Sequence, residues 1–324
     1  MSQIKVLAAD AVDAAVSTLN AGGLIGLPTE TVYGLAAVAE NENAVRRIYE
    51  VKGRPLDHPV IVHIGTFEEI DYWGKEISDE TLLLAKTFWP GPLTLIVKRN
   101  KPAGDWLTGR QETVALRMPD HPVALAVLKK IGKGLAAPSA NKFGSVSPTS
   151  ALHVLQDLSN SLDATRDAVI DGGNCEVGVE STIVDCTAAN PVALRPGAIT
   201  QSQIDQVLNQ KSEAKLENTI KAPGLLASHY APKAKVLLAN DFDEAQELAN
   251  NVSGLFGFIA TEKIPTLKGS LRLAMPKDNS DYAKELYDAL RNGDEQGLQN
   301  IIAVLPEGDD IAIAIRDRLA KAAF

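Results

Sequence analysis

The chain has 324 residues, of which 45% are hydrophobic and 23% are charged. This balance is typical of globular proteins and excludes a disordered chain, a collagen or a continuous coiled coil. The formal net charge is -9, so the surface as a whole does not attract nucleic acid, although a local basic cleft stays open. At roughly 150 residues per domain, the length predicts two domains.

The sequence indicates neither a membrane span nor a secretory signal. No apolar run reaches the roughly 18 residues needed to cross a bilayer. The opening residues, MSQIKVLAAD, lack a basic segment followed by a long apolar stretch. The two cysteines, Cys175 and Cys186, are too few for a disulfide scaffold or a cysteine-rich zinc site. We therefore expect two reduced thiols and a cytoplasmic protein.

The first 210 residues predict a mixed sheet with helices, because several strands follow one another directly. Short apolar stretches predict strands at residues 24–27, 60–64, 93–98, 113–117, 134–137, 168–171, 181–186 and 192–196. Periodic segments predict helices over residues 10–20, 43–51, from Ser78 to the WPGP stop, from His121 onward, and over 201–208.

Residues 211–233 lack periodicity and predict a linker, after which strands and helices alternate to the end of the chain. Strands are expected at residues 235–239, 254–260, 271–274 and 301–305, and helices over 242–250, 280–291 and 309–322. Regular alternation of this kind predicts a small doubly wound parallel sheet over residues 234–324.

Several common catalytic motifs are absent from the sequence. There is no G-x-x-x-x-G-K-[ST] phosphate loop, no dinucleotide fingerprint, no H-E-x-x-H zinc motif and no G-x-S-x-G elbow. What remains is a set of polar loops at strand ends. In one of them Lys52 and Arg54 are two residues apart, and an extended backbone would point both side chains the same way. An arginine fork beside a lysine suits phosphate oxygens, although cations at a helix end also explain this pair.

Arg117 and Arg195 each close an apolar strand, and together with Arg54 they favour a shared anion site. The other candidates are weaker when taken singly. Ser139 and Asn141 have ordinary turn chemistry, and a histidine such as His63 within an apolar strand is usually a satisfied core residue. Residues 29–31 are explained equally well as a capped turn before a helix.

The combination of motifs is far more specific than any one of them. PTETVYGL, KGRP with HPVIVHI, WPGPLTLIVK, VALRMPDHP, APSAN, GVESTIVD and LRPG follow in this order. Over residues 24–197 the chain thereby resembles the YrdC-like family of threonylcarbamoyl-AMP synthases. ASHYAP at residues 227–232, followed by a small α/β unit, resembles the longer, two-domain branch of that family.

The resemblance implies an α/β protein with an N-terminal YrdC-like twisted mixed sheet over residues 1–210. It also implies a linker over the active site at 211–233 and a small Rossmann-like parallel α/β domain over 234–324. The implied enzyme is a nucleotidyltransferase that makes threonylcarbamoyl-AMP and pyrophosphate from L-threonine, bicarbonate and ATP with Mg²⁺. Its product serves the modification of adenosine 37 in tRNAs that read ANN codons. Implied partners are downstream threonylcarbamoyl-transfer proteins and, through a weak contact, tRNA.

The resemblance also assigns residues, and no resident metal site is among them. The implied threonine ligands are Thr31, His63, Arg117, Ala137 and Ser181, and Arg117 suits the threonine carboxylate because a bidentate fork fits that group. The implied ATP ligands are Lys52, Arg54, His58, Thr113, Ser139, Asn141, Ser147, Arg195 and Tyr230. Lys52 and Arg54 are the implied catalytic pair. His58 stands where the family commonly has Asn, so its contact with the nucleotide departs from the family pattern.

Two other functions compete with this interpretation. A double-stranded RNA-binding module would use a concave basic surface, but residues 1–233 are net acidic and aromatic residues are few. A carbamoyltransferase would share the basic residues but needs zinc-ligand or hydrolase elements that this sequence lacks.

The resemblance places Tyr230 near ATP, so we expect Tyr230→Ala to weaken ATP binding with little effect on thermal stability. The alternative is a linker that only braces the second domain.

Overall fold

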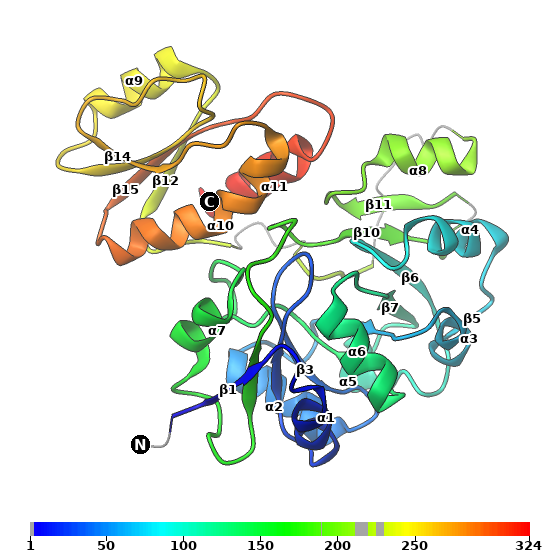
Figure 1. Ribbon diagram of the computed structural model, residues 1–324. Helices are drawn as coiled ribbons and strands as arrows, with labels where there is room; N and C mark the ends of the chain where they lie inside the picture. The colour runs from blue at the N-terminus through cyan, green and yellow to red at the C-terminus, as the bar shows by residue number, and fades with distance from the viewer. Residues whose placement is uncertain (1–2, 189, 211–219, 225–229) are drawn as a thin grey trace. The chain divides into compact units, whose positions relative to one another are not determined.

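The computed structural model describes residues 3–188, 190–210, 220–224 and 230–324 (Figure 1). The chain divides into two compact units. The first comprises Met1–Phe143, Pro148–Cys175 and Glu180–Leu225, and the second comprises Gly144–Ser147, Glu176–Val179 and Leu226–Phe324. Two short segments from the first 210 residues thus belong to the second unit. Of the predicted linker at 211–233, residues 211–219 and 225–229 lie outside the described residues.

The first unit is built on a mixed sheet, as the sequence predicts. Its strands are β1 (Lys5–Ala8), β2 (Ile25–Leu27), β3 (Gly34–Val38), β4 (Ile61–His63), β5 (Gly74–Lys75), β6 (Leu93–Arg99), β7 (Thr113–Arg117), β8 (Leu135–Ala136), β9 (Ala168–Asp171), β10 (Thr182–Asp185) and β11 (Val192–Arg195). Their order is β1-β9-β2-β3-β8-β4-β7-β6-β10-β11, with β5 paired to β6. The predicted strands of this unit are confirmed, while β1, β3 and β5 were not predicted.

Several helices of the first unit begin at a residue whose side chain accepts a hydrogen bond from the first turn, as at Asn41, Ser78, His121, Ser150 and Thr200. The helices of this unit are α1 (Val12–Asn20), α2 (Glu42–Lys52), η1 (Phe67–Glu69), α3 (Ile70–Trp73), α4 (Asp79–Phe88), α5 (Asp105–Thr108), α6 (Pro122–Ile131), α7 (Ala151–Leu158) and α8 (Gln201–Leu208). The Ser78 hydroxyl accepts from the Thr81 N–H and starts α4 as predicted, and His121 caps α6. The described helices include none long and apolar enough to cross a bilayer.

The direction of the central strands brings polar side chains to one edge of the sheet. β4 runs parallel to β7, β7 runs antiparallel to β6, β6 runs parallel to β10, and β10 runs antiparallel to β11. It follows that β4, β7 and β11 share one direction. The last residues of these three strands, His63, Arg117 and Arg195, therefore lie along the same edge.

The second unit contains a parallel sheet with helices on both faces, which confirms the predicted doubly wound arrangement. Its strands are β12 (Lys235–Ala239), β13 (Phe256–Ile259), β14 (Ser270–Ala274) and β15 (Asn300–Val304), in the order β12-β15-β13-β14. Figure 1 shows α9 (Phe242–Asn250) on one face, and α10 (Asn279–Glu295) with α11 (Ala312–Ala322) on the other. Apolar side chains such as Phe258 and Ile302 are fully buried between these layers.

Candidate active site

The backbone between Lys52 and Arg54 is not extended, which corrects the expectation that both side chains point the same way. Lys52 is the last residue of α2, and Gly53 caps the helix with a φ of 67°. Only glycine adopts this left-handed conformation without a steric penalty, so the turn depends on residue 53. As a result, the two cations reach different partners.

Lys52 binds the backbone of the Ser139–Asn141 loop. Its buried Nζ donates to the backbone carbonyls of Ser139 at 2.5 Å and Asn141 at 2.6 Å. Burial, and secondarily the nearby Arg54 charge, lowers the pKa of Lys52 well below its usual value. The Phe143 N–H in turn donates to the Lys52 carbonyl at 2.9 Å. The structure thus joins Lys52 to the loop that carries Ser139 and Asn141.

Arg54 and His58 share one aromatic neighbour. The Arg54 guanidinium lies 5.7 Å from the centroid of the Phe143 ring, and the His58 ring meets the same ring edge-on at 5.4 Å. Nη2 of Arg54 donates to the Pro59 carbonyl at 2.8 Å, which fixes the side chain. Burial and the charge of Arg54 lower the pKa of His58. A neutral His58 has one ring nitrogen to donate and one to accept, so it can replace an asparagine in either role.

Arg117 lies at the centre of a second buried cluster. Its Nη1 donates to the Thr31 hydroxyl at 2.8 Å, and its Nη2 lies 2.6 Å from Oε1 of Glu30. Strand register pairs Arg117 with His63, and paired residues of parallel strands face the same side of the sheet. The sequence interpretation did not select Glu30, because the TET turn alone indicates only capping. Thr29 does cap this turn, but β3 follows the turn rather than a helix.

His63 is uncharged in the folded protein. Burial, reinforced by the positive charge of Arg117, lowers its pKa from 6.5 to about 3. In the unfolded chain the imidazole takes up a proton near pH 6.5, so stability contributed by neutral His63 is present above that pH and lost progressively toward pH 3. An uncharged imidazole can hydrogen-bond a substrate without adding charge to the cluster.

Between pH 7.5 and pH 5.5, the unfolding free energy of the first unit should fall by about 1.4 kcal/mol more in the wild type than in His63→Gln. The measurement is urea unfolding followed by tryptophan fluorescence. It reports on the first unit because Trp73, Trp89 and Trp106 all lie there. Equal pH slopes for the two proteins would contradict a neutral, buried His63.

Ser181 and Arg195 contact each other directly. Nη2 of Arg195 donates to the Ser181 hydroxyl at 3.1 Å and to its carbonyl at 2.8 Å, and the Ser181 hydroxyl lies 2.7 Å from that of Thr94. Nη1 of Arg195 donates to the carbonyl of Pro223, in a described part of the predicted linker. A predicted threonine ligand and a predicted ATP ligand therefore share one hydrogen-bonded cluster.

The linker residues near Pro223 lie against the first unit's sheet. Ile220 and Ala222 pack on an apolar patch that includes Ile61 and Ala115. The side chain of Gln111 exchanges two hydrogen bonds with the Lys221 backbone. This segment thus runs along the sheet face on which Arg117 follows Ala115 at a spacing of two residues.

The remaining predicted ligands are Thr113, Ala137, Ser147 and Tyr230. Thr113 begins β7 and Arg117 ends it, so at about 3.3 Å per residue they are roughly 13 Å apart. Ala137 lies on the other side of β4, where its N–H donates to the Ile61 carbonyl at 3.1 Å. Ser147 and Tyr230 belong to the second unit.

The second unit holds its two predicted ATP ligands firmly. The guanidinium of Arg291 on α10 donates to the carbonyl of Val146 and, at 3.4 Å, to that of Ser147. The buried Tyr230 ring stacks on Tyr287 at 5.7 Å, and the Arg318 guanidinium lies 5.2 Å from its centroid. Tyr230 also has a φ of 61°, a left-handed conformation that packing must stabilise.

The burial of Tyr230 changes the expected effect of its removal. Tyr230→Ala should lose about 3 kcal/mol of the second unit's stability, because a large ring leaves a cavity between Tyr287 and Arg318. Tyr230→Phe keeps the ring and should melt nearly as the wild type does. Calorimetric melting combined with ATP titration measures both properties. An unchanged melting temperature for Tyr230→Ala would restore the expectation from sequence.

The two cysteines do not form a reactive pair. Both are free, and burial raises the pKa of each thiol, that of Cys186 to about 12. Protonated thiols are poor nucleophiles, so covalent thiol catalysis is not indicated.

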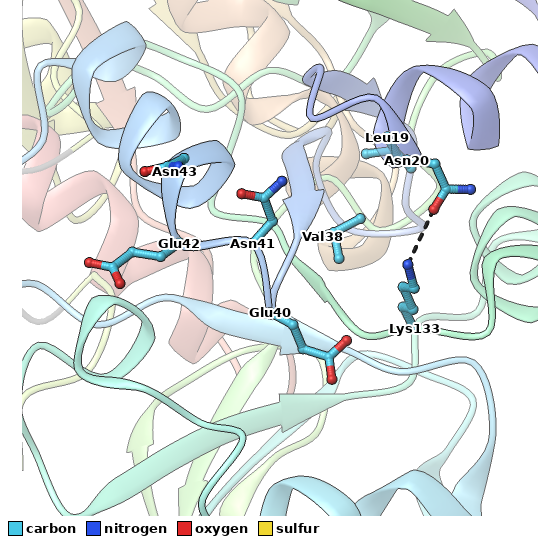
Figure 2. Close-up of a pocket in the computed structure, with 8 residues that line it drawn as sticks. All are labelled: Leu19, Asn20, Val38, Glu40, Asn41, Glu42, Asn43 and Lys133. Carbon is cyan, nitrogen blue, oxygen red and sulfur yellow. Dashed lines mark hydrogen bonds between the residues drawn. The ribbon is translucent and has the colours of Figure 1, made fainter.

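A polar pocket of about 480 Å³ opens at the far end of β3 from Gly34 (Figure 2). The dashed line in Figure 2 joins Nζ of Lys133 to Oδ1 of Asn20 at 3.4 Å. The residues that line the pocket are Leu19, Asn20, Val38, Glu40, Asn41, Glu42, Asn43 and Lys133. None of them is a predicted site residue. Asn41 caps α2 from this pocket. The pocket therefore lies at the start of α2 and is lined by the residue that caps this helix. The candidate active site is the set of clusters described above.

Two protein-family models together match most of the chain. The Sua5/YciO/YrdC family model, described as Telomere recombination, matches residues 17–197. A second model, described as Threonylcarbamoyl-AMP synthase, C-terminal domain, matches residues 199–324. The chain belongs to the threonylcarbamoyl-AMP synthase family. The family, the α/β fold class and the adenylate-forming nucleotidyltransferase activity predicted from sequence are thereby confirmed.

Relatives of this synthase family match nearly the whole chain. The threonylcarbamoyl-AMP synthase of Pyrococcus abyssi is 38% identical over 95% of this chain and 92% of its own length. That of Bacillus subtilis is 39% identical with the same coverages. The crystal structure of P. abyssi Sua5 complexed with L-threonine superposes with a TM-score of 0.87 at 36% identity, covering 99% of this chain and 97% of that one.

Proposed function

We propose that this enzyme forms threonylcarbamoyl-AMP and pyrophosphate from L-threonine, bicarbonate and ATP, in the cytoplasm, for the modification of adenosine 37 in ANN-decoding tRNAs. The observation that carries the proposal is the row of His63, Arg117 and Arg195 at the carboxyl ends of three codirectional strands. The Arg117 cluster suits an amino acid, and the Arg195 and Arg54 clusters suit phosphates. The relative that binds L-threonine supports threonine as the amino acid.

The reaction needs positioning and charge neutralisation more than a nucleophile supplied by the protein. The amine of threonine adds to bicarbonate and gives a carbamate with loss of water. A carbamate oxygen then attacks the α-phosphorus of ATP, and pyrophosphate leaves. An anion here meets a polyanion, so Arg54 and Arg195 would stabilise the charge that develops on the phosphates. Lys52 would act by holding the loop of Ser139 and Asn141 in place.

Mg²⁺ would enter with ATP as part of the substrate. Among the described residues there is no cluster of three or more histidine, cysteine or acidic side chains suited to a metal. Magnesium on a nucleotide commonly keeps several waters and uses phosphate oxygens as its main ligands. The donor set therefore fits Mg²⁺ carried by ATP rather than Mg²⁺ held by a cage of protein carboxylates.

The N-termini of the helices in the second unit are poorly suited to binding phosphate. Carboxylates already occupy the N-termini of α9 and α10, where Asp241 accepts from the Glu244 N–H and Asp278 accepts from the Asp281 N–H. Phosphate at these positions would meet negative charge. We therefore assign the phosphates of ATP to residues of the first unit. Ser147 and Tyr230 stay predicted ATP ligands on the family resemblance alone, and direct tRNA contact stays a weak, secondary interaction.

Pyrophosphate release from ATP in the absence of RNA tests the proposal. Release should require both L-threonine and bicarbonate. Serine should support slower release, and valine almost none, because buried polar groups left without the substrate hydroxyl are costly. Release that ignores threonine, or RNA binding without any release, would favour the RNA-binding alternative.

A further inference from the structure

Glu30 is a buried carboxylate with incomplete hydrogen bonding. It lies in the turn after β2 and is 5% exposed. Within the described part of the chain, neither carboxylate oxygen accepts a hydrogen bond of regular geometry, although Oε1 lies 2.6 Å from Nη2 of Arg117. This contact is short in distance but outside the angular range of a hydrogen bond. A buried carboxylate normally has several donors, so Glu30 has acceptor capacity left over.

Two more unsatisfied polar atoms belong to the same cluster. Among the described residues, Nδ1 of His63 and Nη2 of Arg117 also lack a hydrogen-bond partner. Arg117 joins the three residues, because it contacts Glu30 directly and faces His63 by strand register. Each buried polar atom without a partner costs about 1–3 kcal/mol. The unsatisfied atoms of Glu30, His63 and Arg117 together indicate a ligand that brings both donors and acceptors.

The charges identify the class of ligand. Arg117 supplies a cation, Glu30 an anion, and His63 a neutral ring nitrogen. An amino acid with a free amine is a zwitterion, whose carboxylate suits the guanidinium and whose ammonium suits the carboxylate. We propose that Glu30 binds the ammonium group of the substrate amino acid while Arg117 binds its carboxylate. The proposal deepens the proposed function and rests on it.

This arrangement makes Glu30 a specificity-determining residue. An N-acylated or deaminated substrate has no positive charge to offer, so it would leave the buried carboxylate without compensation. Once the substrate nitrogen has become a carbamate, it is no longer cationic. Glu30 then keeps only a hydrogen bond from the carbamate N–H and loses the attraction between opposite charges, whereas the cationic groups Arg54 and Arg195 favour the new negative charge of the carbamate.

The test compares two ligands across matched variants. L-threonine and 3-hydroxybutanoate differ at the amine, and their affinities are measured by calorimetry without ATP. The wild type should prefer threonine by about 10- to 100-fold, the factor expected for a charged hydrogen bond. Glu30→Gln, which keeps the shape, should reduce this preference to a few-fold, and Glu30→Asp should retain most of it. Glu42→Gln is the control, because Glu42 pairs with Arg46 on the exposed surface of α2 and should keep the full preference.

Two results would overturn the proposal. One is Glu30→Gln with the wild-type preference for threonine. The other is an equal loss of affinity for both ligands in Glu30→Gln and Glu30→Asp, which would make Glu30 a support for Arg117 alone. Tryptophan fluorescence confirms that each variant is folded in the first unit. Wild-type pyrophosphate release is measured in parallel, so a failure of the proposed function appears as an inactive wild type rather than as an altered preference.

Discussion

Arg54→Ala is expected to slow pyrophosphate release by about 10²- to 10³-fold, the usual cost of removing one preorganised charge from a transition state. Stability should change little. The guanidinium donates to the Pro59 carbonyl and lies over the Phe143 ring, and the aliphatic part of the side chain is replaced without loss of a core apolar residue. Turnover should fall at saturating threonine, since Arg54 is assigned to phosphate. Steady-state kinetics with each substrate varied in turn provides the measurement.

Arg46→Ala is the matched control for this variant. Arg46 lies on α2, the helix that ends just before Arg54, but it is exposed and pairs with Glu42 across one helical turn. Such pairs contribute only about 0.3–0.5 kcal/mol, so activity and stability should both remain near those of the wild type. Arg54→Lys keeps the charge but loses the planar fork, and intermediate activity is expected. Wild-type turnover in Arg54→Ala would remove Arg54 from the phosphate site.

Lys52→Met is expected to lose both activity and stability, which separates it from Arg54→Ala. Methionine fills a similar volume but leaves the carbonyls of Ser139 and Asn141 without their buried donor. Each orphaned carbonyl costs about 1–3 kcal/mol, and the loop that carries two predicted ATP ligands is released. We expect urea unfolding by tryptophan fluorescence to shift by several kcal/mol, and pyrophosphate release to fall by at least about 10²-fold.

Lys142→Met is a suitable comparison, because Nζ of Lys142 also reaches a backbone carbonyl, that of Val51, from a partly exposed position. Its loss should cost less stability, since water can replace the donor. A Lys52→Met protein with wild-type unfolding and abolished catalysis would show that Lys52 contacts phosphate instead of holding the loop.

Much of the fold could be predicted because local pattern and tertiary context agree. Apolar strands such as residues 113–117 and the helix at 201–208 have the bounds that the sequence indicates. β3 was missed because GLAAV contains small residues with weak strand preference, and it is a strand through pairing with β2 and β8. α7 was not predicted, although the hydroxyl of Ser150 caps it by accepting from the His153 N–H.

Site residues could be predicted where a charged side chain closes an apolar strand, as Arg117 and Arg195 do. They could not be predicted where the partner is distant in sequence. Lys52 meets carbonyls 87 and 89 residues away, and the left-handed Gly53 redirects Arg54. Glu30 was overlooked because its ion pair with Arg117 exists only after β7 has entered the sheet. Long-range contacts of this kind depend on the complete fold rather than on local pattern.

Direct detection of the product tests the central claim most sharply. The full-length protein is incubated with ATP, Mg²⁺, L-threonine and ¹³C-bicarbonate without RNA, and the reaction is analysed by mass spectrometry. We predict threonylcarbamoyl-AMP carrying a single ¹³C, formed in step with pyrophosphate and strongly diminished in Arg54→Ala. Pyrophosphate release with AMP but no ¹³C-labelled adenylate at any time point would contradict the assignment of this chain as a threonylcarbamoyl-AMP synthase.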